Sequence, residues 1–345
     1  MILFSKDYSE GCHENILKAL NQTNYVQTDG YGTDEYCEEA KSLIKEACSS
    51  PNADIHFLVG GTQTNFTVIA SALKPYQGVI SAVSGHINVH ETGAVEATGH
   101  KVIPLPSDDG KITAQQVEEC FLKHCNSDSA EHEVQPKMVY ISNSTELGTI
   151  YTKSELTELS EVCGKYGLYL FLDGARLGYA LTCKENDLDL QTIAKLCDVF
   201  YIGGTKVGAL FGEAVVITND NLKSDFRYMI KRGGGMLAKG RLLGIQFKEL
   251  FTDNLYFNIA ENANIQAAKI KKALIEKGYS FMSESPTNQL FPVFPDSILE
   301  KLSKEFFFEL QGKTDENHTA VRICTSWATT DEQTEKLIDS ILEIN

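Results

Sequence analysis

Six short apolar runs alternate with helical stretches over the first two thirds of the chain, and this alternation constrains the fold most strongly. Each run is bounded by turn residues, which is typical of strands that are buried on both faces. Apolar residues recur every three or four positions in the helical stretches 34–50 and 152–167. The pattern predicts an α/β fold with a mostly parallel sheet covered by helices. The six runs cover residues 55–59, 78–83, 137–142, 168–173, 198–203 and 214–218.

The pattern changes after residue 220, where two long helical stretches follow each other. Beyond them, short strand-like runs are each followed by a helical segment, which predicts a smaller α+β domain. We therefore expect a large α/β domain over residues 13–250 and a small domain formed by residues 251–345 with the N-terminal segment 1–12. The helical stretches are 221–251, 258–278, 296–307 and 331–344, and the strand-like runs are 288–294 and 319–326.

Composition and charge exclude several classes of function. The chain has 345 residues, of which 42% are hydrophobic and 23% charged, as expected for a globular protein with a large core. Its formal net charge of −16 argues against binding to nucleic acid. The chain shows neither a secretory signal after Met1 nor an apolar run as long as a bilayer is thick. We expect a cytoplasmic protein that does not bind membranes.

The nine cysteines form no CxxC pair, which favours reduced thiols. Cys120, His124 and Cys125 could be interpreted as metal ligands. No matching second pair follows them, so we expect two half-buried thiols at the end of a helix and no metal site.

In a parallel sheet, ligands bind at the carboxyl ends of the strands, so the residues that follow each run are informative. "GGTQTN", residues 60–65, follows the first run and leads into a helical stretch. The free N–H groups and the dipole of that helix would form a phosphate seat at Gly61, Thr62 and Gln63. The alternative is an ordinary strand-to-helix turn in which Thr62 is the N-cap.

Two charged residues follow other apolar runs. Asp173 ends the run 168–173, where an unpaired carboxylate would be costly, so we expect it to meet a cation, a metal or a protonated ring. Arg176 could be its salt-bridge partner. Lys206 lies in "GGTKVGALFG" after the run 198–203. Desolvation there would favour the free amine, whereas the alternative is a surface lysine in a hairpin.

Together, these three features match the requirements of pyridoxal phosphate. That cofactor needs a lysine amine for its aldehyde, helix-terminal amides for its phosphate, and an anion beside its pyridine nitrogen. The sequence therefore predicts a pyridoxal phosphate enzyme. Neither GxGxxG after the first strand nor GxxxxGK[ST] occurs, so a nucleotide-binding regulator is not favoured.

Five motifs, in this order and at these separations, resemble the threonine aldolase branch of the β-eliminating lyases. They are "GGTQTN", "GHINVHETGAVEATGHK", "DGARLGYA", "GGTKVGALFGEAVVI" and "RGGGMLAKGRLLG". The likeness runs from residue 7 to residue 330. It implies the fold-type-I architecture with pyridoxal phosphate, and a lyase that cleaves threonine or allo-threonine to glycine and acetaldehyde. It also implies a homodimer or homotetramer with active sites between subunits. A β-eliminating lyase for another amino acid, and a catalytically weak relative with an interaction role, are the alternatives.

The resemblance also implies roles for residues that would hold the cofactor. Lys206 would bond to the cofactor, and Asp173 would pair with the pyridine nitrogen. Gly61, Thr62 and Thr205 would hold the phosphate. His86 would stack on the ring; the alternative is that it only begins a helix.

Other residues would meet the substrate in the same way. Arg176 would lie near the phenolic oxygen of the cofactor and the substrate carboxylate. Arg322 would clamp that carboxylate with two hydrogen bonds, although it could instead form a buried ion pair. His90 is a further candidate for contact with the substrate. The resemblance also implies that the loop in "KRGGGMLAKGR", 231–241, reaches toward the partner subunit.

One segment departs from the family pattern. Where the better-known aldolases have a motif like Glu-Asn-Thr-His-Asn, this chain has "SNSTELGT", 142–149, without a histidine. The proton of the substrate hydroxyl would then leave through Glu146, Thr145, a water chain or His90. We predict Glu146 as a catalytic residue. A carboxylate can serve as base only if its pKa lies near the working pH, which requires partial burial.

Overall fold

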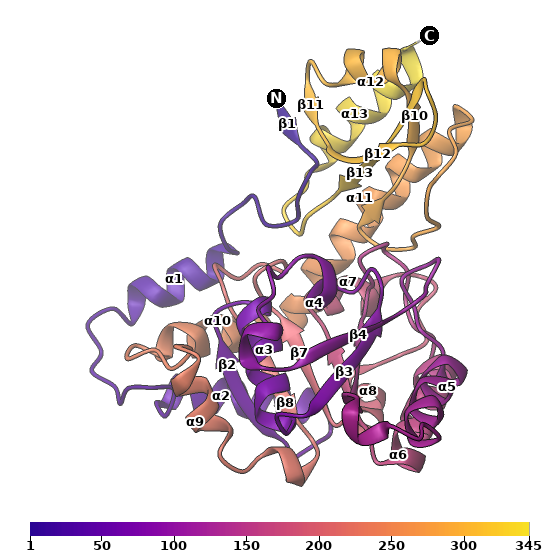
Figure 1. Cartoon of the computed structure of the whole chain (residues 1–345). Helices are drawn as coiled ribbons and strands as arrows, with labels where there is room; N and C mark the ends of the chain where they lie inside the picture. Colours follow the sequence, from indigo (N-terminus) through magenta and orange to yellow (C-terminus); the bar gives the residue numbers. More distant parts are fainter. Residues whose placement is uncertain (345) are drawn as a thin grey trace.

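The computed structural model describes residues 1–344, and a seven-stranded mixed sheet forms its centre (Figure 1). The strand order is β2-β8-β7-β6-β5-β3-β4. β8 runs antiparallel to both of its neighbours, and the other neighbouring pairs are parallel, so the predicted mostly parallel sheet is present. The strands are β2 (Asp54–Leu58), β3 (Gln77–Ala82), β4 (Lys101–Leu105), β5 (Gln135–Ser142), β6 (Tyr169–Asp173), β7 (Val199–Gly203) and β8 (Glu213–Ile217).

The edge strand β4 was not predicted. Its sequence, KVIPL, mixes an exposed lysine and a proline with apolar residues. Proline lacks an N–H donor and is tolerated at a sheet edge, where no further strand needs that donor. The apolar pattern of an edge strand is therefore weaker than that of the central strands, such as β7, in which every residue is buried.

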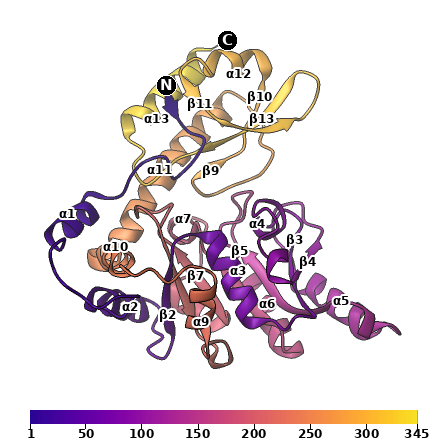
Figure 2. The same cartoon turned by 60° about the vertical axis from the view of Figure 1, so that its left-hand side comes forward.

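Helices cover both faces of the sheet and form two separate cores (Figures 1 and 2). On one face, residues of α2, α5, α6, α8 and α10 pack against the sheet, and on the other face residues of α3, α4 and α9 do so. Local signals set the helix ends. In α6, Thr152 and Glu155 form a reciprocal capping box, and Gly167 ends the helix with φ 63°. These helices are α2 (Glu35–Ala47), α3 (Gly61–Ala72), α4 (His86–Val89), α5 (Ala114–Cys125), α6 (Lys153–Tyr166), α8 (Leu190–Leu196), α9 (Phe226–Arg232) and α10 (Arg241–Phe251).

The C-terminal part of the chain, drawn in orange and yellow in Figure 1, builds two smaller sheets and a third core. The N-terminal strand β1 pairs with β11, so the start of the chain joins this part. The expected helix over 296–307 was wrong at its end, because α12 stops at Leu302 and Phe306–Phe307 form β11. These elements are β1 (Ile2–Leu3), β9 (Gln289–Leu290), β10 (Val293–Pro295), β11 (Phe306–Phe307), β12 (Glu309–Lys313), β13 (His318–Cys324), α12 (Asp296–Leu302) and α13 (Asp331–Glu343).

A long helix connects the two parts of the molecule. α11 (Leu255–Glu276) packs against α7 (Leu177–Thr182) near the large sheet and against α13 in the C-terminal part. The division into 13–250 and 251–345 with 1–12 stays a prediction. The remaining elements are α1 (Glu14–Gln22) and the 3₁₀ helices η1 (Glu96–Thr98), η2 (Ala130–His132), η3 (Asp220–Leu222) and η4 (Thr252–Asn254).

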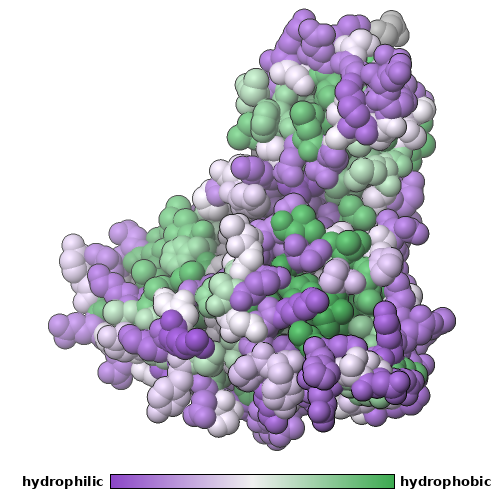
Figure 3. Space-filling view, in the orientation of Figure 1, coloured by the Kyte–Doolittle hydropathy of each residue, from purple (hydrophilic) through white to green (hydrophobic). Residues whose placement is uncertain are grey.

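Exposed apolar side chains gather around α1. Leu17 lies on this helix, and Tyr25 and Val26 follow it, with Tyr25 exposed to 95%. Figure 3 shows an apolar area on the flank that α1 forms.

The close contact between α2 and α10 depends on a glycine. A Cβ added at Gly244 would lie 2.6 Å from both the backbone nitrogen and the Sγ of Cys37. We expect Gly244→Ala to lower the free energy of unfolding by about 1–3 kcal/mol, since the helices cannot move apart without losing core contacts. Denaturant unfolding measures this change.

Gly164→Ala in α6 is the matched control. A Cβ at Gly164 meets nothing within 4 Å, so this variant should gain about 0.5–1 kcal/mol from helix propensity. Equal stability of the two variants would contradict the proposed role of the contact.

Candidate active site

One cavity of about 270 Å³ lies at the carboxyl ends of β2, β6 and β7. The structure brings together there Lys206, Asp173 and the turn Gly60–Thr62. Because β8 is antiparallel, its first residue, Glu213, lies at the same edge of the sheet and lines the same cavity. His86, Glu146, Arg176 and Thr205 also line the cavity.

Asp173 is buried and accepts four hydrogen bonds. Its Oδ2 accepts from the Tyr140 hydroxyl at 2.5 Å and from Asn65 Nδ2 at 3.1 Å. Its Oδ1 accepts from the Tyr201 hydroxyl at 2.5 Å and from the Ala175 N–H at 2.9 Å. Burial opposes ionisation, but the nearby His86 and the two tyrosine hydroxyls outweigh it, so the pKa of Asp173 lies below its ordinary value. The carboxylate is therefore held as an anion.

Asp173 is not paired with Arg176, which was one of the alternatives. Instead, Arg176 Nε and Nη2 donate to the two carboxylate oxygens of Asp7 at 2.7 and 3.1 Å. Asp7 is fully buried and also accepts from Asn288. Arg176 still lines the cavity, but two of its donor nitrogens are engaged.

Lys206 lies in a turn that is packed closely against the segment following Asp173. Gly203 donates its N–H to Gly174, and a Cβ at Gly203 would lie 2.4 Å from the Ala175 carbonyl oxygen. Only glycine permits this approach. Burial, followed by the positive charge of Arg176, lowers the pKa of the Lys206 amine, which favours its neutral and nucleophilic form.

The turn at Gly60–Gly61 begins α3 without a side-chain cap. The N-cap is Gly60, and no side chain accepts from the first N–H groups of the helix. The alternative of Thr62 as N-cap was therefore wrong, since Thr62 lies inside the helix. The first turn of α3 points uncapped N–H groups toward the cavity edge, where an anion can accept from them.

The side chain of Gln63 is not free to bind a phosphate, because both of its polar atoms have hydrogen-bond partners within the protein. Its Oε1 accepts from the Val59 N–H at 3.2 Å, and its Nε2 donates to the Gly233 carbonyl at 3.1 Å. The side chain thus ties the start of α3 to the glycine loop 233–235. Only the backbone N–H of Gln63 is available to an anion at the helix start.

His86 begins α4 and is oriented by a buried carboxylate. Glu91 Oε1 lies 2.8 Å from His86 Nδ1 and accepts from Asn65 Nδ2 at 2.7 Å. Asn65 also donates to Asp173, so it connects the two carboxylates. A carboxylate beside Nδ1 favours a proton on that nitrogen, both in the neutral and in the charged ring, so a proton is gained or lost at Nε2.

Glu146 lies beside His86 in the segment that lacks the family histidine. Its Oε1 accepts from the His86 N–H at 2.9 Å and from the Ser142 hydroxyl at 2.7 Å. Burial raises its pKa above the ordinary value. Thr145, by contrast, is buried and hydrogen-bonded to Thr149, and it does not line the cavity.

A second cavity of about 640 Å³ adjoins the first and shares Lys206, His86 and Glu146 with it. The two remaining predicted residues, His90 and Arg322, line this second cavity. The ring centroids of His90 and His86 are 5.6 Å apart.

Arg322 has several partners within the protein. Its Nη2 donates to Glu309 at 2.5 Å and to the Ser5 carbonyl at 3.1 Å, and its Nη1 donates to Gln289 at 3.3 Å. Its Nε is buried without a hydrogen-bond partner. The ion pair is thus present, and the side chain of Glu309 is partly exposed.

Sequence reasoning missed several residues of this site. Tyr140 and Tyr201 lie inside apolar strands, where their hydroxyls require a partner, and that requirement could have directed attention to Asp173. Glu213 precedes four apolar residues in β8, so an unpaired carboxylate would be as costly there as at Asp173. Nothing in the local sequence indicated a role for Asn65, which lies on α3, or for Glu91, which lies in the loop after α4.

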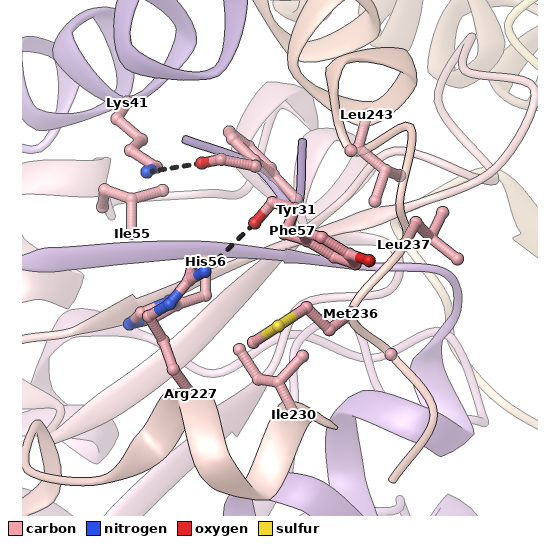
Figure 4. Close-up of a pocket in the computed structure, with 13 residues that line it drawn as sticks. Tyr31, Lys41, Ile55, His56, Phe57, Arg227, Ile230, Met236, Leu237 and Leu243 are labelled. Carbon is pink, nitrogen blue, oxygen red and sulfur yellow. Dashed lines mark hydrogen bonds between the residues drawn. The ribbon is translucent and has the colours of Figure 1, made fainter. Parts of the chain in front are cut away.

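A separate small cavity lies beside β2, away from these residues (Figure 4). Its volume of about 30 Å³ has room for about two water molecules. Lys41 donates to the Gly32 carbonyl, and Arg227 donates to the Tyr31 carbonyl, so these cations hold the neighbouring backbone. His56 is half-buried there, and desolvation of its ring lowers its pKa to about 3. We interpret this cavity as a packing feature.

Within residues 1–344, neither a metal centre nor a membrane-spanning helix is found. No group of three or more His, Cys, Asp or Glu side chains in this range is arranged to hold a metal ion, and all nine cysteines are free thiols. Over the same residues, no helix combines the length and apolar character that crossing a bilayer requires.

The residues of the main cavity fit pyridoxal phosphate. They offer an amine with a lowered pKa, a carboxylate held as an anion, and uncapped helix N–H groups, which are the three groups that this cofactor requires.

Comparisons with known proteins agree with this fit. Residues 5–294 match the family model described as Beta-eliminating lyase. The low specificity L-threonine aldolase of Pseudomonas aeruginosa is 27% identical over 98% of this chain and 96% of that protein, and the one of a Pseudomonas species is 28% identical over the same shares. The structure of the Leishmania major threonine aldolase has a TM-score of 0.96 at 45% identity, covering 99% of this chain and 98% of that one.

A more distant structure shares the fold alone. An aspartate aminotransferase of Thermus thermophilus has a TM-score of 0.71 at 13% identity, covering 99% of this chain and 91% of that chain. The predicted fold class and cofactor are thereby confirmed, and the chain belongs to the β-eliminating lyase family of fold-type-I pyridoxal phosphate enzymes.

Proposed function

We propose that the protein is a pyridoxal phosphate-dependent carbon–carbon lyase that cleaves threonine or allo-threonine to glycine and acetaldehyde. The observation that carries this proposal is the meeting of Lys206, Asp173 and the uncapped start of α3 in one cavity. The similarity to threonine aldolases over nearly the whole chain supports the choice of substrate. The bound cofactor would supply an electron sink for the electron pair released when the Cα–Cβ bond breaks.

Each of the other residues of the cavity would have its own role in holding the cofactor. Asp173 offers a fixed anion to the pyridine nitrogen, and Lys206 offers a neutral amine. Gly61, Thr62 and Thr205 would hold the phosphate. The ring of His86, fixed by Glu91, would lie against the cofactor ring with Nε2 free to accept a proton.

The substrate carboxylate would be held by Arg322. Its present partner Glu309 is partly exposed, so its side chain can turn into solvent and leave Nη2 to the substrate. His90 lines the same cavity and could contact the polar end of the substrate. Arg176 would act mainly through its fixed pair with Asp7.

The proton of the β-hydroxyl would leave through Glu146. This carboxyl group lies at the boundary of the two cavities, and burial raises its pKa toward the range in which a base works well. Glu146 would thus replace the histidine that the segment 142–149 lacks.

We also propose that the protein is cytoplasmic and assembles as a homodimer or homotetramer with active sites between subunits. The exposed apolar side chains around α1 support an interface on that flank (Figure 3). Lys231 or Arg232, next to the glycine loop 233–235, would contribute to the partner's site.

The first test concerns the lysine. Borohydride reduction of the enzyme with its cofactor, followed by peptide mapping, should place a pyridoxyl group on Lys206, because its amine lines the cavity and has a lowered pKa. Lys206→Ala should carry no label. A label on another lysine of the wild-type chain would refute the assignment.

The second test concerns the base. Glu146→Gln keeps the size of the side chain and removes its ability to accept a proton, so the turnover of threonine should fall about 10²–10⁴-fold. Glu131→Gln is the control. Glu131 is exposed and lines neither cavity, so this variant should retain the rate of the wild type. Release of acetaldehyde measures both. An unimpaired Gln variant would mean that water or a histidine accepts the proton.

A further inference from the structure

Glu213 is a buried carboxyl group that the proposed mechanism does not use. It is 3% exposed and begins β8, where it lies opposite Leu58 of β2 and Gly203 of β7. The two neighbouring strands lead directly into the turn at Gly60 and the turn at Thr205. The carboxyl group therefore lies between the two loops that would hold the phosphate, and it lines the same cavity.

An ionised carboxylate at this position would oppose binding of the phosphate. A phosphate ester carries close to two negative charges near neutral pH, and a buried like charge nearby is costly. The positive charge of Lys206 favours the anion, but burial outweighs it and the pKa of Glu213 lies above its ordinary value. A neutral Glu213 would remove this conflict.

The hydrogen bonds around Thr205 show what a neutral Glu213 would do. Glu213 Oε1 lies 2.9 Å from Thr205 Oγ1, and Glu213 Oε2 accepts from the Gly204 N–H at 3.1 Å. Thr205 Oγ1 also accepts from the Gly212 N–H at 2.9 Å, and the Gly212 carbonyl oxygen, at 3.4 Å, is a weak acceptor for its proton compared with a charged phosphate. A threonine hydroxyl has one proton to donate and can accept two hydrogen bonds.

The direction of the bond between Glu213 and Thr205 follows from this count. If Glu213 is ionised, it can only accept, so it takes the single proton of Thr205. If Glu213 is neutral, it donates to Thr205 Oγ1, which then accepts from Gly212 and Glu213 and keeps its own proton for another acceptor.

We propose that Glu213 is a positioning residue that, as a neutral acid, donates to Thr205 and so frees the Thr205 hydroxyl to donate to the cofactor phosphate. This inference rests on the proposed cofactor site and adds a residue to it. Ionisation of Glu213 would remove the Thr205 donor and add a repelling charge in one step.

The electrostatic surroundings agree with a neutral carboxyl group. Burial raises the pKa of Glu213 to about 8; Lys206 lowers it and Asp173 raises it. Tyr201 and Tyr256 also face Glu213, and burial raises the pKa of both hydroxyls, so they stay neutral over the range of interest. Glu213 is thus neutral below about pH 8 and ionised above it. Affinity for the phosphate should fall as the pH rises through this value.

The test measures binding rather than activity. Pyridoxine 5′-phosphate carries an alcohol in place of the aldehyde, so it reports the phosphate site without bonding to Lys206. Calorimetric titration of the cofactor-free full chain between pH 7 and pH 9.5 should show its affinity falling about tenfold or more, because a hydrogen bond to a charged group is lost. Pyridoxine without the phosphate should bind with little change over this range.

Two variants separate Glu213 from other titrating groups. Glu213→Gln has a permanent amide donor toward Thr205, so it should bind the phosphate compound tightly at all these pH values. Thr205→Val lacks the hydroxyl and should bind it weakly throughout. If Glu213→Gln keeps the pH dependence of the wild type, another titrating group such as Lys206 causes it and the inference fails.

The remaining outcomes distinguish this inference from the proposed function. Tight binding by the wild type that does not vary with pH would overturn the role of Glu213 and leave the cofactor site intact. If neither compound binds at any pH, the cofactor site and the role of Glu213 both fail.

Discussion

The negative charge of Asp173 is the constraint on which the rest of the site depends. Four donors converge on this buried carboxylate, three from different elements and one from the loop after β6: Tyr140 of β5, Asn65 of α3, Tyr201 of β7 and the N–H of Ala175. Charge-assisted hydrogen bonds are stronger than neutral ones, and burial strengthens them further. The same bonds therefore stabilise the anion and fix the relative positions of the strand ends that carry Lys206 and the start of α3.

Asp173 and Glu213 show how position within one sheet edge sets the state of a carboxyl group. Both are buried and end or begin an apolar strand. Asp173 has four donors, and the nearby His86 also favours its anion, which lowers its pKa. Glu213 has one backbone donor, the Gly204 N–H, and a threonine hydroxyl that can donate or accept, and the charges of Lys206 and Asp173 act on it in opposite directions. Burial therefore prevails, and its pKa rises to about 8. The pair follows the general rule that environments push two carboxyl groups of one site toward different tasks.

Much of the fold could be predicted because the central strands and the longer helices carry strong local patterns. Every residue of β7 is buried, and α6 begins with a complete capping box, so each element could be predicted from its own local sequence. β4 and β11 could not be predicted in this way. β4 is an edge strand with a proline, and β11 exists only because β1, about 300 residues away in the sequence, pairs with it.

The site was predictable to the extent that its chemistry could be read at strand ends. Lys206 and Asp173 stood out because charges are rare after apolar runs. Arg176 illustrates the limit, since its partner Asp7 is distant in the sequence and no local pattern indicates which carboxylate a buried guanidinium will meet.

The antiparallel direction of β8 explains why Glu213 escaped the same reasoning. The rule that ligands gather at carboxyl ends holds for parallel strands, and it draws attention to the residues that follow each run. In an antiparallel strand, the amino end lies at that edge instead, so the residue to inspect is the first one. A sheet with one reversed strand between β2 and β7 thus brings a carboxyl group into the site from the start of a strand. The direction of a single strand thereby places an acid between the two loops proposed to hold the phosphate, and in that proposal the burial of the acid sets the pH range in which the loops bind an anion.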